Sequence, residues 1–236
     1  GNGSSDAHAR GHAPNAVGFF TNYNNVTGGL SRNQVISDVV NTYNCMFTTA
    51  SWGNAQTTQY TSVSADADDI VFDHRIPWTN SMSNLGNTNV RPQAWAKNVI
   101  SVGGVQHFNN SSAADDSWLA GNGSTGPAQD GRNKPDLAAY YDQVWTSDLS
   151  AGVDNGEGTG ATGGYNTAAG VAGQSFTGFS GTSSATPIVA GHNALAIQMY
   201  TDGIFNNPLP ASPTQANRFV NRPLAQTLKA LQIVAA

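Results

Sequence analysis

The sequence predicts a single α/β domain of three layers, in which helices cover both faces of a mostly parallel central sheet. Short apolar runs that are typical of buried strands alternate with helical segments along the chain, and no second core can be identified. Of the 236 residues, 26 are glycine, 10 are proline and only 11% are charged, which indicates a globular chain rich in loops.

The first half of the chain is expected to hold two helices and two short strands. Pro14 suits the first turn of one helix, and Ser31 can cap the other, whose valines and isoleucine fall on one face. The predicted helices cover residues 12–20 and 31–42, the strands 45–51 and 69–73, and the polar stretch 55–69 is expected to be partly helical.

The second half is expected to alternate strands and helices in the same way. Strands are predicted over residues 98–103 and 142–145, and helices over 185–200 and 223–234. The last helix places its apolar side chains on one inward face, which is formed by Leu224, Leu228, Leu231 and Val234.

Charge and composition exclude two classes of partner. A net charge of −5 provides no basic surface for nucleic acid, and no apolar run approaches the roughly 18–20 residues of a membrane span. The single cysteine, Cys45, cannot form an internal disulfide and is expected to pack as a small hydrophobic residue. The chain begins at Gly1 with small polar residues, which we interpret as the processed N-terminus of a secreted or extracellular protein.

Residues 179–191 contain the most informative motif, Phe-Ser-Gly-Thr-Ser-Ser-Ala-Thr-Pro-Ile-Val-Ala-Gly. Gly181 permits a tight turn, Ser183 lies where an irregular segment enters an apolar helix, and Pro187 is expected in the first turn. The run resembles the nucleophile motif of the subtilisin family of serine peptidases, Gly-Thr-Ser-x-Ala-x-Pro-x-Val-Ala-Gly. An ordinary Ser/Thr cap on a buried helix is the alternative, and the match at every fixed position tells against it.

Further segments resemble the same family over most of residues 12–200. Residues 96–104 are similar to Ala-Lys-Asn-Val-Ile-x-Val-Gly, and residues 126–137 to Gly-Pro-Thr-x-Asp-Gly-Arg-x-Lys-Pro-Asp-Val, although the Ala-Pro-Gly that usually follows is replaced. Ser51, Trp52 and Gly53 resemble the Ser-x-Gly segment that pairs with an extended substrate and borders its specificity pocket. Trp52 either forms a wall of this pocket or packs in the core.

The resemblance implies an oxyanion residue and a catalytic base. The family's oxyanion asparagine lies in Asn-x-Gly, which favours Asn84 over Asn87 and Asn80; an ordinary turn asparagine is the alternative. The histidine motif is degraded here, but its flanking glycines favour His12 as the base over His8. The remaining histidines have no motif and are expected to be solvated or hydrogen-bonded: His74, His107 and His192.

The family's triad aspartate is not found in this chain. It belongs to a strand well before the histidine motif, whereas Asp6, in a polar segment, is the one acid before His12. The resemblance thus implies that the domain, residues 1–236, begins between the family's Asp and His motifs. We expect the missing aspartate on a segment absent from this chain, which is either a companion N-terminal chain that completes the fold or a preceding part of the protein that this sequence does not include.

Three functions are compatible with these observations. The first is a secreted serine endopeptidase that cleaves peptide or protein substrates through an acyl-enzyme on Ser183, with His12 as the base and with Asn84 and the Ser183 N–H as the oxyanion hole. The second is a catalytically impaired pseudo-peptidase or peptide-binding module that keeps the groove. The third is a sedolisin-type peptidase with an acidic base, which the segments 96–104 and 126–137 disfavour.

The proposed chemistry requires no cofactor. The family often binds structural calcium, but the acidic clusters of this chain match no calcium-loop spacing, so the sequence predicts no particular metal ligands. These clusters are Asp66, Asp68 and Asp69, and Asp115 and Asp116.

Overall fold

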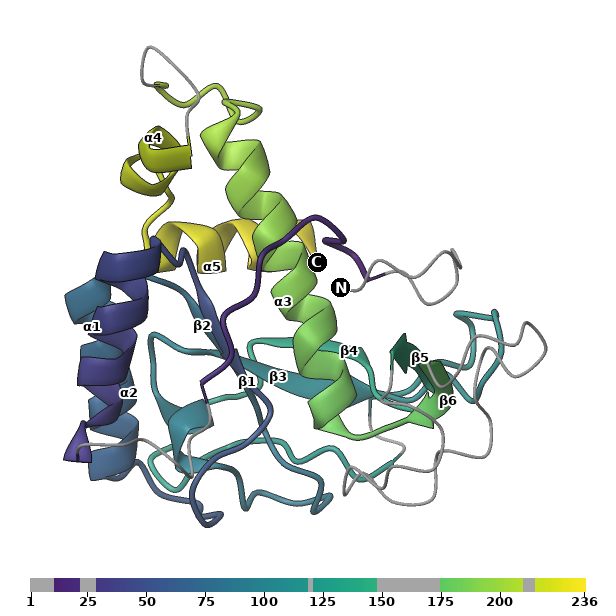
Figure 1. Ribbon diagram of the computed structural model, residues 1–236. Coiled ribbons are helices and arrows are strands. Elements are labelled where there is room, and N and C mark those ends of the chain that lie inside the picture. The colour runs from purple at the N-terminus through teal and green to yellow at the C-terminus, as the bar shows by residue number, and fades with distance from the viewer. Residues whose placement is uncertain (1–10, 22–28, 119–120, 148–174, 210–214) are drawn as a thin grey trace.

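The computed structural model describes residues 11–21, 29–118, 121–147, 175–209 and 215–236 (Figure 1). Within this part, four parallel strands form a sheet in the order β1-β2-β3-β4, and β5 and β6 form a separate antiparallel pair. The strands are β1 (Thr48–Ala50), β2 (Trp78–Ser81), β3 (Ile100–Val105), β4 (Leu137–Tyr140), β5 (Val144–Ser147) and β6 (Ser175–Phe179). The helices are α1 (Arg32–Tyr43), α2 (Ser62–His74), the 3₁₀ helix η3 (Pro92–Trp95), α3 (Thr182–Thr201), α4 (Gln215–Val220) and α5 (Ala225–Ala235).

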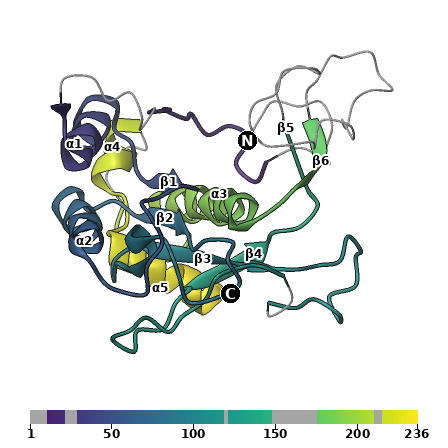
Figure 2. The same ribbon diagram turned by 90° about the horizontal axis from the view of Figure 1, so that it is seen from below.

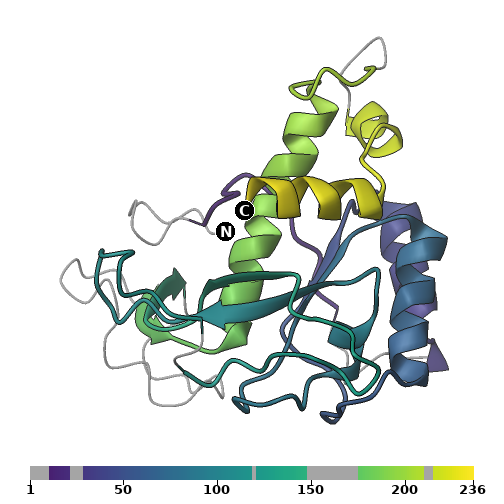
Figure 3. The same cartoon turned by 180° about the vertical axis from the view of Figure 1, so that it is seen from behind.

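Helices cover both faces of the four-stranded sheet, as the sequence predicts. On one face, α3 packs Ala185 and Val189 against Ile100 and Val102 of β3. On the other side, α2 and the first residue of α5 share a hydrophobic core cluster with β2, α1 packs in turn on α2, and α5 also contacts α3 (Figures 2 and 3). The result is a three-layer α/β/α arrangement, in which α3 begins within the motif of residues 179–191.

Several predicted elements are confirmed. The helix predicted over 31–42 is α1, and Ser31 caps it in a capping box: its hydroxyl accepts from the Gln34 N–H, and the Gln34 side chain accepts from the Ser31 N–H. Strands β1 and β3 and helices α3 and α5 also lie where the sequence predicts them. No helix among the described residues is long and apolar enough to cross a membrane.

Two predicted elements are wrong. Residues 12–20 form no helix, and only one turn, in which the Ala16 N–H donates to the Ala13 carbonyl, is present. Val17 and Phe20 are 81% and 92% exposed, so no burial of apolar surface stabilises a helix there. Residues 69–73 belong to α2 because Ile70 and Val71 continue its buried face.

The strand that precedes Asn84 is β2, in a stretch where no strand was predicted. Its residues Thr79, Asn80 and Ser81 are polar and yet almost fully buried. A hydrophobic pattern therefore could not reveal this strand. Strand β4 is likewise not predicted, and it contains residues 138–140, which stand where the family usually has Ala-Pro-Gly.

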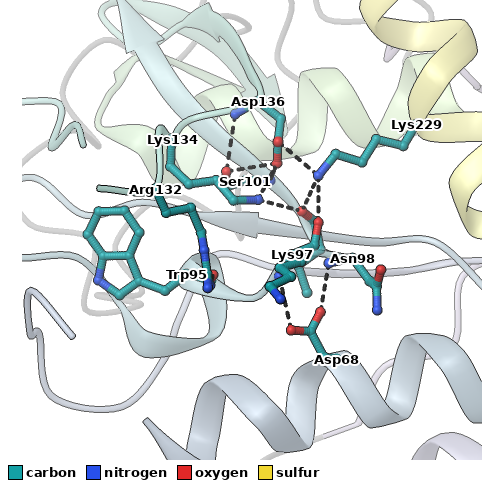
Figure 4. Close-up of polar contacts among 10 residues, drawn as sticks. Asp68, Trp95, Lys97, Asn98, Ser101, Arg132, Lys134, Asp136 and Lys229 are labelled. Carbon is teal, nitrogen blue, oxygen red and sulfur yellow. Dashed lines mark hydrogen bonds and ion pairs between the residues drawn. The ribbon is translucent and has the colours of Figure 1, made fainter. Parts of the chain in front are cut away.

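A buried charge cluster fastens α5 to the sheet (Figure 4). Asp136 accepts from Lys134 (2.6 Å), from Lys229 of α5 (2.8 Å) and from the N–H and hydroxyl of Ser101. Burial lowers the pKa of Lys134 to about 8 against the opposing pull of Asp136. For Asp136, burial acts to raise the pKa, but the two lysines outweigh it and lower the pKa. Lys134 and Asp136 of the segment 126–137 thus have a structural role.

Asp68, one of the clustered acids, also has a structural role. Its carboxylate accepts from the backbone N–H groups of Lys97 and Asn98, at 3.1 and 2.7 Å, and so ties α2 to the segment before β3 (Figure 4). Among the described residues, no group of three or more histidine, cysteine or acidic side chains could hold a metal ion. Cys45 is half-buried, and burial raises the pKa of its thiol.

Candidate active site

Ser183 lies in the first turn of α3, two residues after Gly181, a glycine that no other residue could replace without strain. Gly181 has φ +91°, which L-residues rarely adopt, and a Cβ placed there would lie 2.7 Å from Nδ2 of Asn84. The Gly181 N–H donates to the Tyr141 carbonyl at 2.6 Å. The start of α3 is therefore anchored to the end of β4 and pressed against Asn84.

Asn84 follows β2, and its side chain is oriented by the start of α3. Its Oδ1 accepts from the N–H and from the hydroxyl of Thr182, at 2.7 and 2.9 Å. Because a backbone N–H can only donate, this contact identifies the oxygen of the carboxamide. Nδ2 is thereby turned toward Gly181, two residues before Ser183, where it can donate to a ligand.

The two rival asparagines lie elsewhere. Asn80 is buried within β2, where its Nδ2 donates to the Ser81 carbonyl. Asn87 forms a turn, in which its Oδ1 accepts from the Asn89 N–H at 2.8 Å. The structure brings Asn84, and neither rival, to the start of α3.

Ser51 meets Ser183 through a reciprocal pair of hydrogen bonds. The Ser183 hydroxyl donates to the Ser51 carbonyl (3.3 Å), and the Ser51 hydroxyl donates to the Ser183 carbonyl (3.1 Å). That carbonyl needs an outside donor because Pro187, four residues later, has no N–H to give it. Since α3 starts at Thr182, Pro187 lies in the second turn rather than in the expected first.

The chain after Ser51 is held rigidly by two side chains. Arg91 donates to the carbonyls of Gly53 and Asn54, at 3.2 and 3.1 Å, and Gln93 exchanges two hydrogen bonds with Asn54. A Cβ at Gly53 would lie 2.6 Å from the Gln93 side chain, so the chain can approach this closely only with glycine.

Trp52 packs against the start of α1. The Arg32 guanidinium lies 4.6 Å from the centre of its ring and 5.8 Å from that of Trp78. Burial lowers the pKa of Arg32, and Asp66 opposes this shift. This contact accounts for one side of Trp52, and a role in substrate binding stays a prediction.

The His12 side chain packs against the outside of α3, at a place away from Ser183. Its ring contacts His192 edge to face, with ring centres 4.7 Å apart, and a Cβ at Gly191 would lie 2.9 Å from its own Cβ. Gly191 follows Ser183 by eight residues, or about 12 Å along the helix axis at 1.5 Å per residue. The structure therefore does not bring His12 and Ser183 together. His8 and Asp6 lie outside the described residues.

The other histidines have separate partners. Burial, and then the proximity of His12, lower the pKa of His192. Nδ1 of His107 lies 2.9 Å from Oδ1 of Asp142, and its ring stacks on Tyr140. His74 is hydrogen-bonded to Asn33 (2.7 Å). His74 and His107 are thus hydrogen-bonded residues of the surface, as the sequence suggested.

Two further residues of the site were not singled out from the sequence. Thr182 orients Asn84, and its position between Gly181 and Ser183 in the motif was the available signal. Ser83, directly before Asn84, is buried and has φ +149°, and no sequence pattern indicates this conformation.

Comparison with known proteins identifies a family and a fold. Residues 1–230 match the model of the subtilase family. Similar solved structures include a lanthipeptide protease (TM-score 0.54, 18% identity, 84% of this chain and 56% of that one) and sphericase (0.52, 17%, 86% and 53%). Another is the S41 psychrophilic protease (TM-score 0.50, 15% identity, 86% and 52%). At these identities the likeness shows a shared fold.

The chain spans little more than half of the length of each of these three structures. A search of the curated proteins finds no match to it.

Proposed function

Because the chain belongs to the subtilase family, we propose that it is a secreted serine endopeptidase that hydrolyses peptide bonds through an acyl-enzyme on Ser183. One observation carries the proposal: a half-buried serine hydroxyl and an oriented amide donor meet at the N-terminus of a long helix. This is the pairing that acyl transfer requires, since the nucleophile and the donor for the developing oxyanion must lie side by side.

In the proposed reaction, the Ser183 Oγ attacks the scissile carbonyl and its proton passes to a base. The negative charge that develops on the carbonyl oxygen accepts hydrogen bonds from Nδ2 of Asn84 and from the Ser183 N–H, which has no partner within the first turn of a helix. The positive end of the α3 dipole adds to this stabilisation. Water then hydrolyses the acyl-enzyme, and no cofactor enters the chemistry.

The substrate is proposed to lie extended along Ser51, Trp52 and Gly53. Backbone groups of an extended peptide can pair with such a segment by strand addition. Its rigidity supports this role, because Arg91 and Gln93 already fix the segment and little order remains to be gained on binding. We also propose that the protein can bind structural calcium, for which we assign no ligands.

His12 is proposed as the base, brought to Ser183 when a companion N-terminal segment supplies the triad acid. Two observations support a rearrangement. Val17 and Phe20 are strongly exposed, which is typical of apolar residues that lack their partner. In the described sheet, β1 is an outer strand, so its free edge can accept a further strand next to Ser51.

The alternative is a peptide-binding module with impaired chemistry. The separation of His12 from Ser183 favours it, since a serine without a base is a weak nucleophile. The ordered pairing of Asn84 with Thr182 favours the peptidase, since the binding of a peptide alone does not require an oriented oxyanion donor.

Labelling with a fluorophosphonate probe, followed by hydrolysis of a peptide library, separates these functions. A peptidase labels at Ser183, and Ser183→Ala loses both labelling and hydrolysis. His12→Ala should lose most of the labelling rate, whereas His192→Ala, the matched change at the neighbouring ring, should keep it. Tight peptide binding without labelling or hydrolysis would establish the binding module instead.

A further inference from the structure

The residue before Asn84 holds a backbone conformation that side chains disfavour. Ser83 has φ +149°, in the range that glycine adopts readily and other residues rarely do, and it is 5% exposed. Such a conformation persists only where the surrounding structure imposes it, and it is found preferentially at functional sites. At this position it sets the direction in which the chain carries Asn84 toward α3.

Backbone contacts fix the turn on both sides of Asn84. The Ser83 carbonyl accepts from the Ser124 N–H at 2.8 Å, and the Ser124 hydroxyl accepts from the Leu85 N–H at 3.1 Å. The next N–H, of Gly86, donates to the Asn122 carbonyl at 2.8 Å. Asn84 itself is exposed, so its movement is limited by these three hydrogen bonds and by its contact with Thr182.

The side chain of Ser83 joins this turn to the predicted substrate segment. Its Oγ accepts from Nε2 of Gln56 at 3.3 Å. Gln56 follows Gly53 by three residues and is half-buried, so the bond links the turn before Asn84 to the chain that follows the segment 51–53. Among the described residues, neither the Gln56 nor the Ser83 side chain has a hydrogen bond to Ser183, so we expect an effect on the reaction to act through the adjacent Asn84.

We propose that Ser83 and Gln56 are positioning residues that aim Nδ2 of Asn84 at the developing oxyanion and couple this donor to the segment 51–53. This rests on the proposed peptidase function. The contribution of an oxyanion donor depends on its placement before the reaction, so a loosened turn should weaken the transition state and leave substrate binding intact.

The test is a double-mutant cycle on peptide hydrolysis. Gln56→Leu and Ser83→Ala should each lower kcat roughly 10-fold with KM unchanged, a part of the roughly 10²–10³ that complete loss of such a donor costs. In an Asn84→Ala background, both changes should have no further effect, because the donor they position is gone. Gln59→Leu serves as the control, because it alters an exposed glutamine three residues after Gln56, and it should keep the parent kcat.

Ser83→Gly distinguishes positioning from packing. Glycine adopts φ +149° freely and keeps the turn, so this variant should retain more of kcat than Ser83→Ala. If the side chain only fills space, alanine should be the better substitute. Thermal unfolding of each variant verifies that it is folded.

The outcomes also separate this inference from the proposed function. If the parent enzyme neither labels nor hydrolyses, the peptidase function fails. If the parent hydrolyses peptide but Gln56→Leu lowers kcat equally in the Asn84→Ala background, or changes KM instead, the positioning role alone is overturned.

Discussion

The serine side and the histidine side of the candidate site are built in different ways. Ser183, Thr182, Asn84 and Ser51 are bonded to one another where β1, β2 and α3 meet. His12 lies on an exposed segment without helix or strand and contacts α3 more than two turns beyond Ser183. The nucleophile and the oxyanion donor are thus fixed by the fold itself. The base, in contrast, lies on residues 11–21, which are part of no helix or strand.

The strongest test of the serine side is Ser183→Ala, which should abolish hydrolysis and leave the fold intact. Only a hydroxyl at the start of α3 is lost, together with its 3.3 Å bond to the Ser51 carbonyl. Ser184→Ala is the control, because the Ser184 hydroxyl is buried and already donates to the Gly181 carbonyl at 2.8 Å. Near-parent turnover by Ser183→Ala in a peptidase assay contradicts the assignment of the nucleophile.

Asn84→Ala should lower kcat by roughly 10²–10³ with little change in KM, the size known for removing one such donor in a subtilisin. The physical reason is that Nδ2 meets negative charge only in the transition state. Asn87→Ala, which removes an asparagine that is hydrogen-bonded within its own turn, should keep the parent kcat. Steady-state kinetics of both variants decides the matter, and the reverse result would transfer the role to Asn87.

Gly181→Ala tests whether the serine side depends on close packing. A Cβ would lie 2.7 Å from Nδ2 of Asn84 at φ +91°, so the donor must move and the turn is strained, at about 1–3 kcal/mol of unfolding free energy. Gly131→Ala separates the two effects, since Gly131 has φ +81° and open space around it. We expect both variants to lose stability and only Gly181→Ala to lose kcat.

The same contrast explains what the sequence could and could not predict. The motif around Ser183 fixes its own geometry, because Gly181, Thr182 and Pro187 each have a local reason to be there, and Asn84 was found by its place before a glycine. Strand β2 escaped because its buried residues are polar. The helix predicted over 12–20 failed because an apolar pattern stabilises a helix only when its face is covered.

The charge cluster beneath the sheet provides a reference that is independent of the site. The pKa of Lys134 is lowered to about 8 from 10.5, so between these values the folded chain binds fewer protons than the unfolded chain. The unfolding free energy should therefore rise as pH increases from about 8 to about 10. Lys134→Met should remove this rise, which denaturant titrations at several pH values can measure. A rise that persists in Lys134→Met assigns the effect to another group.

The smallest expected effect concerns the histidine side, and it is seen in the protein without mutation. Backbone amides of residues 11–21 should exchange with solvent far faster than those of α3, because one turn bond and an exposed apolar stretch do little to protect them. His12→Ala should accordingly change the unfolding free energy by no more than about 0.5 kcal/mol, as is usual at the surface. If an added N-terminal segment completes the site, the exchange of residues 11–21 should slow and that of α3 should stay unchanged, since only the first gains partners. Strong protection of residues 11–21 in the isolated chain would show instead that the histidine side is as fixed as the serine side, and that His12 has no route to Ser183.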